Sequence, residues 1–239
     1  MALARRNVLI LALVLLGACG RRGFDALSDA SVDSGRPPLD ARPDVPAGSC
    51  GPIDDLVDGF DTTQPLPVWD NYPGSAVGQS QVGSELLLVL PNGEGPPAYG
   101  GLTSKCAYDL RGRSIVLAID MVPTRVTGTN MGIEISSGND GALLEQNGVQ
   151  LIASTSVGTA LTTQYSTTFD IATHKFFALE EDAGDVVWLT SQDGATFVEV
   201  ARFGGALVDT SQVYVDVYAG TYKAVGNPGR ASFTGVSVR

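Results

Sequence analysis

From about residue 53 onward, the chain is a series of short apolar runs separated by Gly, Asn and Asp. The runs are rich in β-branched and aromatic residues, and several alternate with a period of two, which predicts half-buried β-strands. In Val213–Ala219 the aliphatic side chains occupy one face, and Tyr214, Asp216 and Tyr218 occupy the other. The predicted strands are Glu85–Leu90, Ser114–Val122, Met131–Ser136, Val149–Ser154, Lys175–Glu181, Val186–Ser191, Thr196–Phe203, Val213–Ala219 and Ala231–Val238.

These strands predict a single all-β domain over residues 53–239. Helical periodicity is scarce, and this many short strands within about 185 residues are typical of a two-sheet antiparallel β-sandwich or jelly roll. A domain of this size buries a core of its own. Between two of the strands, Asp193-Gly194 predicts a tight hairpin turn, because both residues accept a positive φ.

The longest apolar run lies near the start of the chain, in Val8–Leu16, directly after two arginines. It is about half as long as the roughly 20 residues that cross a bilayer, so it predicts a cleaved signal rather than a membrane anchor. The sequence Leu16-Gly17-Ala18-Cys19 resembles the lipobox of bacterial lipoproteins. That resemblance implies a lipoprotein signal peptide over 1–18 and acylation of Cys19, palmitate included. An ordinary secretory signal with a chance cysteine is the alternative.

Residues 19–52 are rich in Asp, Ala, Ser, Gly and Pro, which predicts a disordered tether that follows the lipidated Cys19. The chain carries a net charge of −11, which excludes nucleic acid as a partner, since nucleic-acid binders need a basic face. The expected partner is a lipid bilayer of the bacterial cell envelope. The outer membrane is favoured, because Gly20 is not the aspartate that retains many lipoproteins at the inner membrane.

The chain has three cysteines, and acylation of Cys19 would leave Cys50 and Cys106. An exported protein meets an oxidising environment in which disulfides persist, so we expect these two to be bonded. Two free thiols are the alternative.

Several stretches of the domain resemble concanavalin A-like lectin and glucanase (LamG-like) sandwich domains of secreted bacterial proteins. The stretches are Val57–Asp61 followed by Trp69, Gly83–Leu90, His174–Phe197, Val213–Tyr222 and Gly229–Val238. The resemblance implies a two-sheet jelly roll whose concave face often carries a carbohydrate site, sometimes with calcium.

Glucanases of this superfamily place E-I-D-x-x-E on one strand, so that its carboxylates project together into the cleft. The corresponding segment here is Glu134–Asn139, in which Ser136 replaces the middle acid and Gly138 or Asn139 the last one. One carboxylate cannot act both as acid and as nucleophile. We therefore expect no enzyme and no catalytic residues.

A sugar site needs aromatic rings for the apolar ring face and carboxylates or amides for the hydroxyls. Tyr214, Asp216 and Tyr218 supply that combination on one strand, and the family topology would place Trp188 on an adjoining strand. The alternative is that these aromatic residues pack within the sandwich.

No cofactor is expected, with calcium as the single alternative. Four aspartates cluster at the start of the domain, and Asp58 and Asp61 in the D-G-F-D sequence are the candidate calcium ligands. Capping of turns is the competing interpretation of these residues.

The resulting hypothesis is a membrane-anchored envelope lipoprotein that presents a non-catalytic, carbohydrate-binding β-sandwich. The alternative is a structural or adhesive lipoprotein whose sandwich binds an envelope protein. A glycoside hydrolase-like enzyme stands third, because the paired carboxylates are missing at Glu134–Asn139.

The lipobox generates the first prediction. Cys19→Ser removes the acylated sulfur, so we expect the protein to leave the membrane fraction or to remain unprocessed. Membrane fractionation with mass spectrometry of the N-terminus measures both outcomes. Membrane association of a correctly processed Cys19→Ser protein would contradict the lipoprotein hypothesis.

Overall fold

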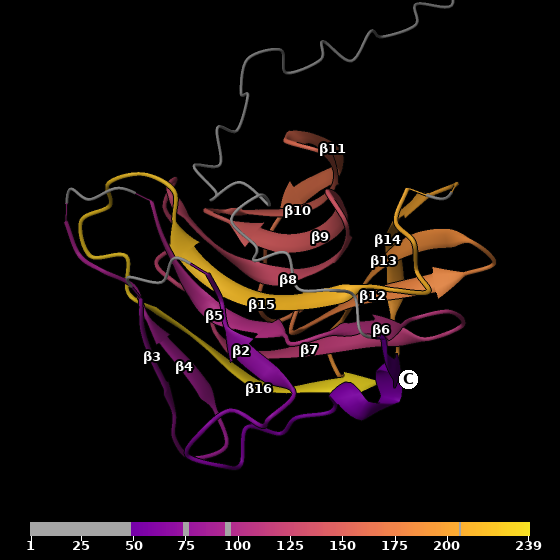
Figure 1. The fold of residues 1–239 in the computed structure, drawn as a ribbon. Coiled ribbons are helices and arrows are strands. Elements are labelled where there is room, and N and C mark those ends of the chain that lie inside the picture. Colours follow the sequence, from indigo (N-terminus) through magenta and orange to yellow (C-terminus); the bar gives the residue numbers. More distant parts are fainter. Residues whose placement is uncertain (1–48, 74–76, 94–96, 206) are drawn as a thin grey trace, which may run out of the picture. The chain divides into compact units, whose positions relative to one another are not determined.

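A computed structural model describes residues 49–73, 77–93, 97–205 and 207–239. These residues form a sandwich of two seven-stranded antiparallel sheets, together with a small parallel sheet of two strands (Figure 1). The elements are β1 (Ser49–Pro52), the 3-10 helix η2 (Ile53–Leu56), β2 (Trp69–Asn71), β3 (Gly78–Gln81), β4 (Leu86–Val89), β5 (Ala98–Ser104), β6 (Ala107–Asp109), β7 (Ser114–Met121), β8 (Thr129–Ser137), β9 (Asp140–Asn147), β10 (Gln150–Val157), β11 (Ala160–Thr168), β12 (Phe176–Asp182), β13 (Asp185–Ser191), β14 (Val198–Phe203), β15 (Tyr214–Thr221) and β16 (Arg230–Val238).

The two large sheets follow one topological rule. The first sheet has the order β11-β10-β9-β8-β15-β5-β2, and the second has the order β14-β13-β12-β7-β16-β4-β3. In the first sheet, hairpins connect β8 to β11, and β15 joins β8 to the early strands β5 and β2. In the second sheet, hairpins connect β12 to β14, β12 pairs with β7, and β16 joins β7 to the early strands β4 and β3. This interleaving confirms the predicted all-β jelly-roll sandwich.

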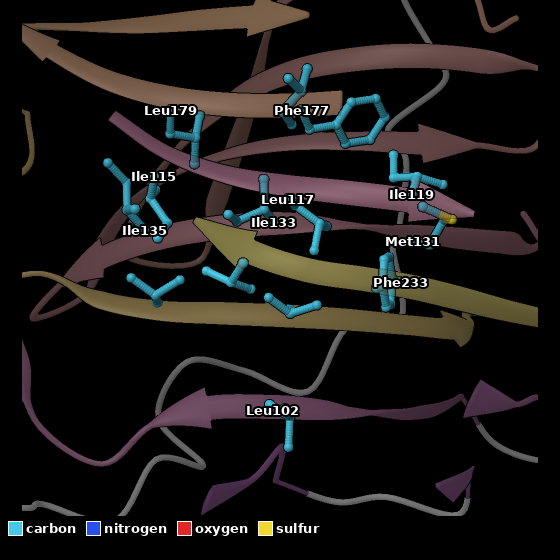
Figure 2. Close-up of a cluster of buried hydrophobic side chains, with 14 of the residues drawn as sticks. Leu102, Ile115, Leu117, Ile119, Met131, Ile133, Ile135, Phe177, Leu179 and Phe233 are labelled. Atoms are coloured by element: carbon cyan, nitrogen blue, oxygen red, sulfur yellow. The ribbon is translucent and has the colours of Figure 1, made fainter. Parts of the chain in front are cut away.

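The core lies between the inner faces of the two sheets. On β8 every second residue points inward, and Met131, Ile133 and Ile135 are fully buried there. They pack toward the aliphatic residues of β7 and β12 and toward Phe233 of β16 (Figure 2). The same period of two holds in β15, where Val213, Val215, Val217 and Ala219 belong to the core. The predicted orientation of this strand is therefore confirmed.

The apolar pattern of the sequence did not predict the strands that consist largely of polar residues. β11 contains mainly Thr, Ser and Gln, and β9 ends in Glu-Gln-Asn, so neither resembles a strand by apolar alternation. Both form because hairpins carry them onto a growing sheet, in which backbone hydrogen bonds do not depend on the side chains.

The predicted hairpin turn at Asp193-Gly194 is confirmed. Asp193 Oδ1 accepts hydrogen bonds from the backbone N–H groups of Ala195 (2.9 Å) and Thr196 (2.8 Å). The Ser191 hydroxyl accepts one from the Gly194 N–H at 2.9 Å, and Gly194 has φ +74°. These donors stabilise the carboxylate and hold the pKa of Asp193 below its usual value.

A disulfide joins Cys50 on β1 to Cys106, just before β6, and confirms the predicted pair. It fastens the parallel β1–β6 pair, so residues 49–52 belong to the folded part and the boundary predicted at residue 53 falls one strand late. The predicted signal peptide, Cys19 and the tether up to residue 48 lie outside the described residues. Within the described ranges, no helix is long and apolar enough to cross a membrane.

Removal of the disulfide should destabilise the domain without abolishing its fold. The bond closes a loop with a sequence separation of 56 residues, for which the chain-entropy relation gives about 4 kcal/mol. We expect the Cys50→Ala/Cys106→Ala protein to lose about this much free energy of unfolding in urea. Reduced wild-type protein is the matched control and should behave like the double variant. Equal stability of oxidised and reduced protein would contradict the prediction.

Candidate functional site

The polar residues between the inward-facing residues of the first sheet share its opposite side, which we call the outer face. In Figure 1, β8, β9 and β15 are bowed and the second sheet lies on the convex side of the bow, so the outer face is concave. The alternation of burial and core membership along the strands assigns side chains to this face. The polar and aromatic ones are Tyr72, Tyr99, Asn130, Glu134, Ser136, Glu145, Asn147, Ser154, Ser156, Tyr214, Asp216 and Tyr218.

Two carboxylates lie side by side at the centre of the outer face. Glu134 of β8 and Asp216 of β15 are directly opposed in the antiparallel register. Each is only 1% exposed. Directly opposed residues place their Cβ atoms about 4.5–5.5 Å apart, and like charges at that spacing destabilise a sheet. The fold therefore holds two buried carboxyl groups next to each other on adjacent strands.

A glycine in the next strand makes room for one of these acids. A Cβ atom at Gly141 of β9 would lie 2.9 Å from Glu134 Oε1 and 2.8 Å from Ser156 Oγ. The Glu134 side chain therefore leans over β9, away from Asp216 on the other side of β8.

A third carboxylate, Glu145 of β9, is fully engaged in a hydrogen-bond network. It accepts hydrogen bonds from the Tyr218 hydroxyl (2.8 Å), from Asn130 Nδ2 (3.0 Å) and from Asn147 Nδ2 (3.1 Å). The Tyr222 hydroxyl in turn donates to Asn147 Oδ1 at 3.0 Å. A buried carboxylate with several donors is satisfied without a cation, so Glu145 serves to hold its neighbours in position.

The hydrogen bond between Tyr218 of β15 and Glu145 of β9 passes over Gly132 of the intervening strand β8. Gly132 is the register partner of both Glu145 on β9 and Tyr218 on β15. A Cβ atom there would lie 2.9 Å from Glu145 Cβ, so any larger residue would obstruct the approach of the two side chains. The absent side chain of Gly132 lets Tyr218 reach Glu145 across an entire strand.

Tyrosine rings border the carboxylates. Tyr72, Tyr99 and Tyr218 form one buried cluster, with ring centroids 5.9–6.3 Å apart. Tyr222 packs against this cluster, and burial raises the pKa of its hydroxyl. Tyr214 is half-buried on the outer face, next to Asp216 along the strand. The face thus combines aromatic rings with carboxylates and amides.

The structure confirms the face predicted for three of the four sugar-site candidates and corrects the fourth, and sugar binding itself stays a prediction. Tyr214, Asp216 and Tyr218 share the outer face as predicted. Trp188 does not join them, because it is a β13 residue of the second sheet and is fully buried in the core. Its indole N–H donates to the backbone oxygen of Leu143 across the sandwich at 2.8 Å. The prediction that placed Trp188 beside the tyrosines is therefore wrong.

Asp58 and Asp61, the predicted calcium ligands, have different environments. Asp58 is buried, and its Oδ1 accepts a hydrogen bond from the Phe60 N–H at 2.7 Å, which holds Phe60 at φ +53°. Burial raises the pKa of the Asp58 carboxyl, whereas Asp61 is exposed. Within the described part of the chain, no group of three or more His, Cys, Asp or Glu side chains is arranged to hold a metal. Calcium binding stays a prediction.

Comparison with solved structures places the fold among glycoside hydrolases. The family 43 protein BlXynB of Bacillus licheniformis is similar at TM-score 0.59 and 15% identity over 76% of this chain. This chain spans only 38% of the length of that protein. A β-1,3-1,4-glucanase (lichenase) from a mouse hindgut metagenome matches at TM-score 0.55 and 16% identity, over 75% of this chain and 96% of its own.

A third similar structure is SCLam, a non-specific endo-β-1,3(4)-glucanase of family 16. It has TM-score 0.57 and 10% identity, over 76% of this chain and 88% of its own. No family model matches the sequence, and no curated protein matches it. At these identities the likeness establishes a concanavalin A-like jelly-roll fold.

The prediction that this chain is not an enzyme is wrong. It rested on the missing second acid within Glu134–Asn139, but the similar structures are glycoside hydrolases. The search for a second acid was confined to one strand, whereas the fold brings Asp216 opposite Glu134 from a strand some 80 residues away. Glu145 and Asn130 were also missed. The signal for Asn130 was the alternation of Met131, Ile133 and Ile135, which turns their sequence neighbours to the other face. Glu145 lies on β9, whose sequence shows no apolar alternation.

The Glu145 network generates a stability prediction. Glu145→Ala leaves three buried donors without their acceptor, so we expect a loss of about 3 kcal/mol in free energy of unfolding. Glu145→Gln retains one acceptor oxygen and should lose less.

Urea unfolding measures both losses. Glu199→Ala is the matched control, because Glu199 forms an exposed ion pair with Arg202, worth at most about 1 kcal/mol. If Glu145→Ala cost no more than this control, the network would have no structural role.

Proposed function

We propose that this protein binds a glycan across the outer face of its first sheet and hydrolyses it with Glu134 and Asp216. The direct register pairing of these two acids on the concave face is the observation that carries the proposal. Tyr214, which is half-buried on the same face, would stack on the apolar face of a sugar ring, and the asparagines and carboxylates would bind hydroxyls.

The chemistry requires two carboxyl groups on opposite sides of the scissile bond. One donates a proton to the glycosidic oxygen as the bond from C1 to that oxygen breaks. The other either attacks C1 or activates the water that does so, and water supplies the hydroxyl of the new reducing end. Separations of about 5–5.5 Å suit the first route and about 6.5–9.5 Å the second.

The cost of the arrangement supports a functional role. Two opposed carboxylates destabilise an antiparallel pair, and burial adds a desolvation penalty that an apolar pair would avoid. A pair of buried carboxyl groups on a concave face is a candidate for a functional site. Gly141 and Gly132 are small residues inside strands, where glycine is unfavourable, yet they make room for Glu134 and for the Tyr218–Glu145 contact.

The lipobox at Cys19 supports a place for this activity in the bacterial envelope, with the domain attached to the membrane through an acyl anchor. An envelope glycan or a polysaccharide at the cell surface would then be the accessible substrate. Binding of an envelope protein by the sandwich is the second candidate role carried by the same anchor.

The substrate test uses mixed-linkage β-1,3-1,4-glucan and β-1,3-glucan, which the similar enzymes suggest. We expect Glu134→Gln and Asp216→Asn each to lower the rate of reducing-end release by about 10²- to 10⁴-fold, because each removes one acid or base. Both variants should still bind the oligosaccharide product in calorimetry.

Glu199→Gln serves as the control, since Glu199 lies on β14 of the other sheet, and its rate should equal that of the wild type. Unchanged hydrolysis in both acid variants would exclude Glu134 and Asp216 as the catalytic pair. Wild-type protein that neither binds nor cleaves any glucan would remove glucan as the substrate class.

A further inference from the structure

A second cavity lies where the edge strand of one sheet meets the edge region of the other. It has a volume of about 430 Å³, within the range of small-molecule pockets. β11 supplies Tyr165, and the turn after β11 supplies His174. The β13–β14 hairpin supplies Thr190, Asp193 and Val198, among others. None of these residues belongs to the outer-face site.

Irregular pairing in both edge strands flanks this cavity. On β14, Ala201 pairs with Trp188 and Glu199 pairs with Leu189, so Val200 is the extra residue of a β-bulge. On β11, Tyr165 pairs with Ala153 and Thr163 pairs with Ser154, so Gln164 is the extra residue of another. Bulges redirect side chains and occur beside functional sites. Val200 and Tyr165, at or next to these bulges, both line the cavity.

The lining offers no positive charge to a ligand, and its one carboxylate already accepts hydrogen bonds from the protein. It contains neither Lys nor Arg. Asp193 already accepts hydrogen bonds from two backbone N–H groups and the Ser191 hydroxyl. His174 Nδ1 accepts a hydrogen bond from the Asp170 N–H at 3.1 Å, which places the proton of the neutral ring on Nε2. Burial lowers the pKa of His174, so the ring is neutral at pH 7. An anionic ligand would find no counter-ion here.

The lining does offer hydroxyl and apolar groups together. Thr173, Thr190 and Thr196 bring hydroxyls, and Val198, Val200 and Tyr165 bring apolar surface. Thr190 and Val198 are cross-strand partners, so one hydroxyl and one 61% exposed aliphatic side chain stand next to each other. A small ligand that matches such a lining is neutral, carries several hydroxyls and has an apolar face.

We propose that the cavity between β11 and the β13–β14 hairpin is a binding site for a neutral mono- or disaccharide, separate from the outer-face site. It would hold a sugar unit at the edge of the sandwich while the outer face acts on another. The proposal rests on the composition of this cavity and does not depend on Glu134 and Asp216 being catalytic.

The test measures binding of neutral sugars to the full-length protein by saturation-transfer NMR. The probes are glucose, galactose, cellobiose and laminaribiose, with glucuronate as the charged analogue. We expect at least one neutral sugar to bind and glucuronate to bind at least tenfold more weakly, because a buried carboxylate lacks a partner in this lining.

Two variants locate the site. Thr190→Val keeps the side-chain shape and removes one hydroxyl, so affinity should fall roughly tenfold, the effect of one lost hydrogen bond. Val198→Glu places a charge in the cavity from an exposed position that folding tolerates, and should abolish binding. Neither variant should change the rate of glucan hydrolysis, which distinguishes failure of this site from failure of the outer-face site.

The proposal would be overturned by any of three results. Absence of binding by every probe would exclude a sugar site, and equal binding of glucuronate would refute the charge argument. Neutral-sugar binding that Val198→Glu leaves unchanged but that Glu134→Gln/Asp216→Asn removes would assign it to the outer face.

Discussion

The packing of the aliphatic inner faces of β8 and β15 against the second sheet determines where the chemistry of this protein lies. Ile133, Ile135, Val215 and Val217 are buried completely between the sheets. Because side chains alternate strictly along a strand, burial of these four residues leaves one orientation for those between them. A slip of one residue would turn the acids into the core between the sheets and the aliphatic side chains onto the outer face. The hydrophobic effect therefore fixes the register that opposes two carboxylates.

The opposed acids and the glycines inside β8 and β9 are each unfavourable in a strand when considered locally. Opposed carboxylates repel, and glycine inside a strand costs conformational entropy. The core supplies the compensating free energy, since each fully buried large aliphatic or aromatic side chain contributes about 1.5–3 kcal/mol. A sandwich with an extensive core remains stable even when residues on its outer face are unfavourable. Gly132 leaves space for Tyr218 and Glu145, and Gly141 leaves space for Glu134. The core and the proposed site occupy opposite sides of the same strands.

The sequence predicted what depends on local pattern. The all-β class, the orientation of Val213–Ala219, the Asp193-Gly194 turn and the Cys50–Cys106 bond all follow from alternation, turn chemistry or cysteine pairing. It could not predict contacts that depend on strand order. Trp188 was assigned to the wrong sheet, and Asp216 could be paired with Glu134 only once β15 was known to lie beside β8.

Strand order also explains why the motif on β8 alone gave no sign of a second acid beside Glu134. A motif on one strand records two acids that are two residues apart, about 6.6 Å along the strand. Direct neighbours on adjacent strands come closer still, with Cβ atoms about 4.5–5.5 Å apart. In a jelly roll, β15 enters the first sheet from the far end of the sequence, so its partners on β8 share no local signal with it. The absence of a linear motif on β8 therefore says little about the carboxylates on this concave face. Function on such a fold has to be sought across the sheet as well as along each strand.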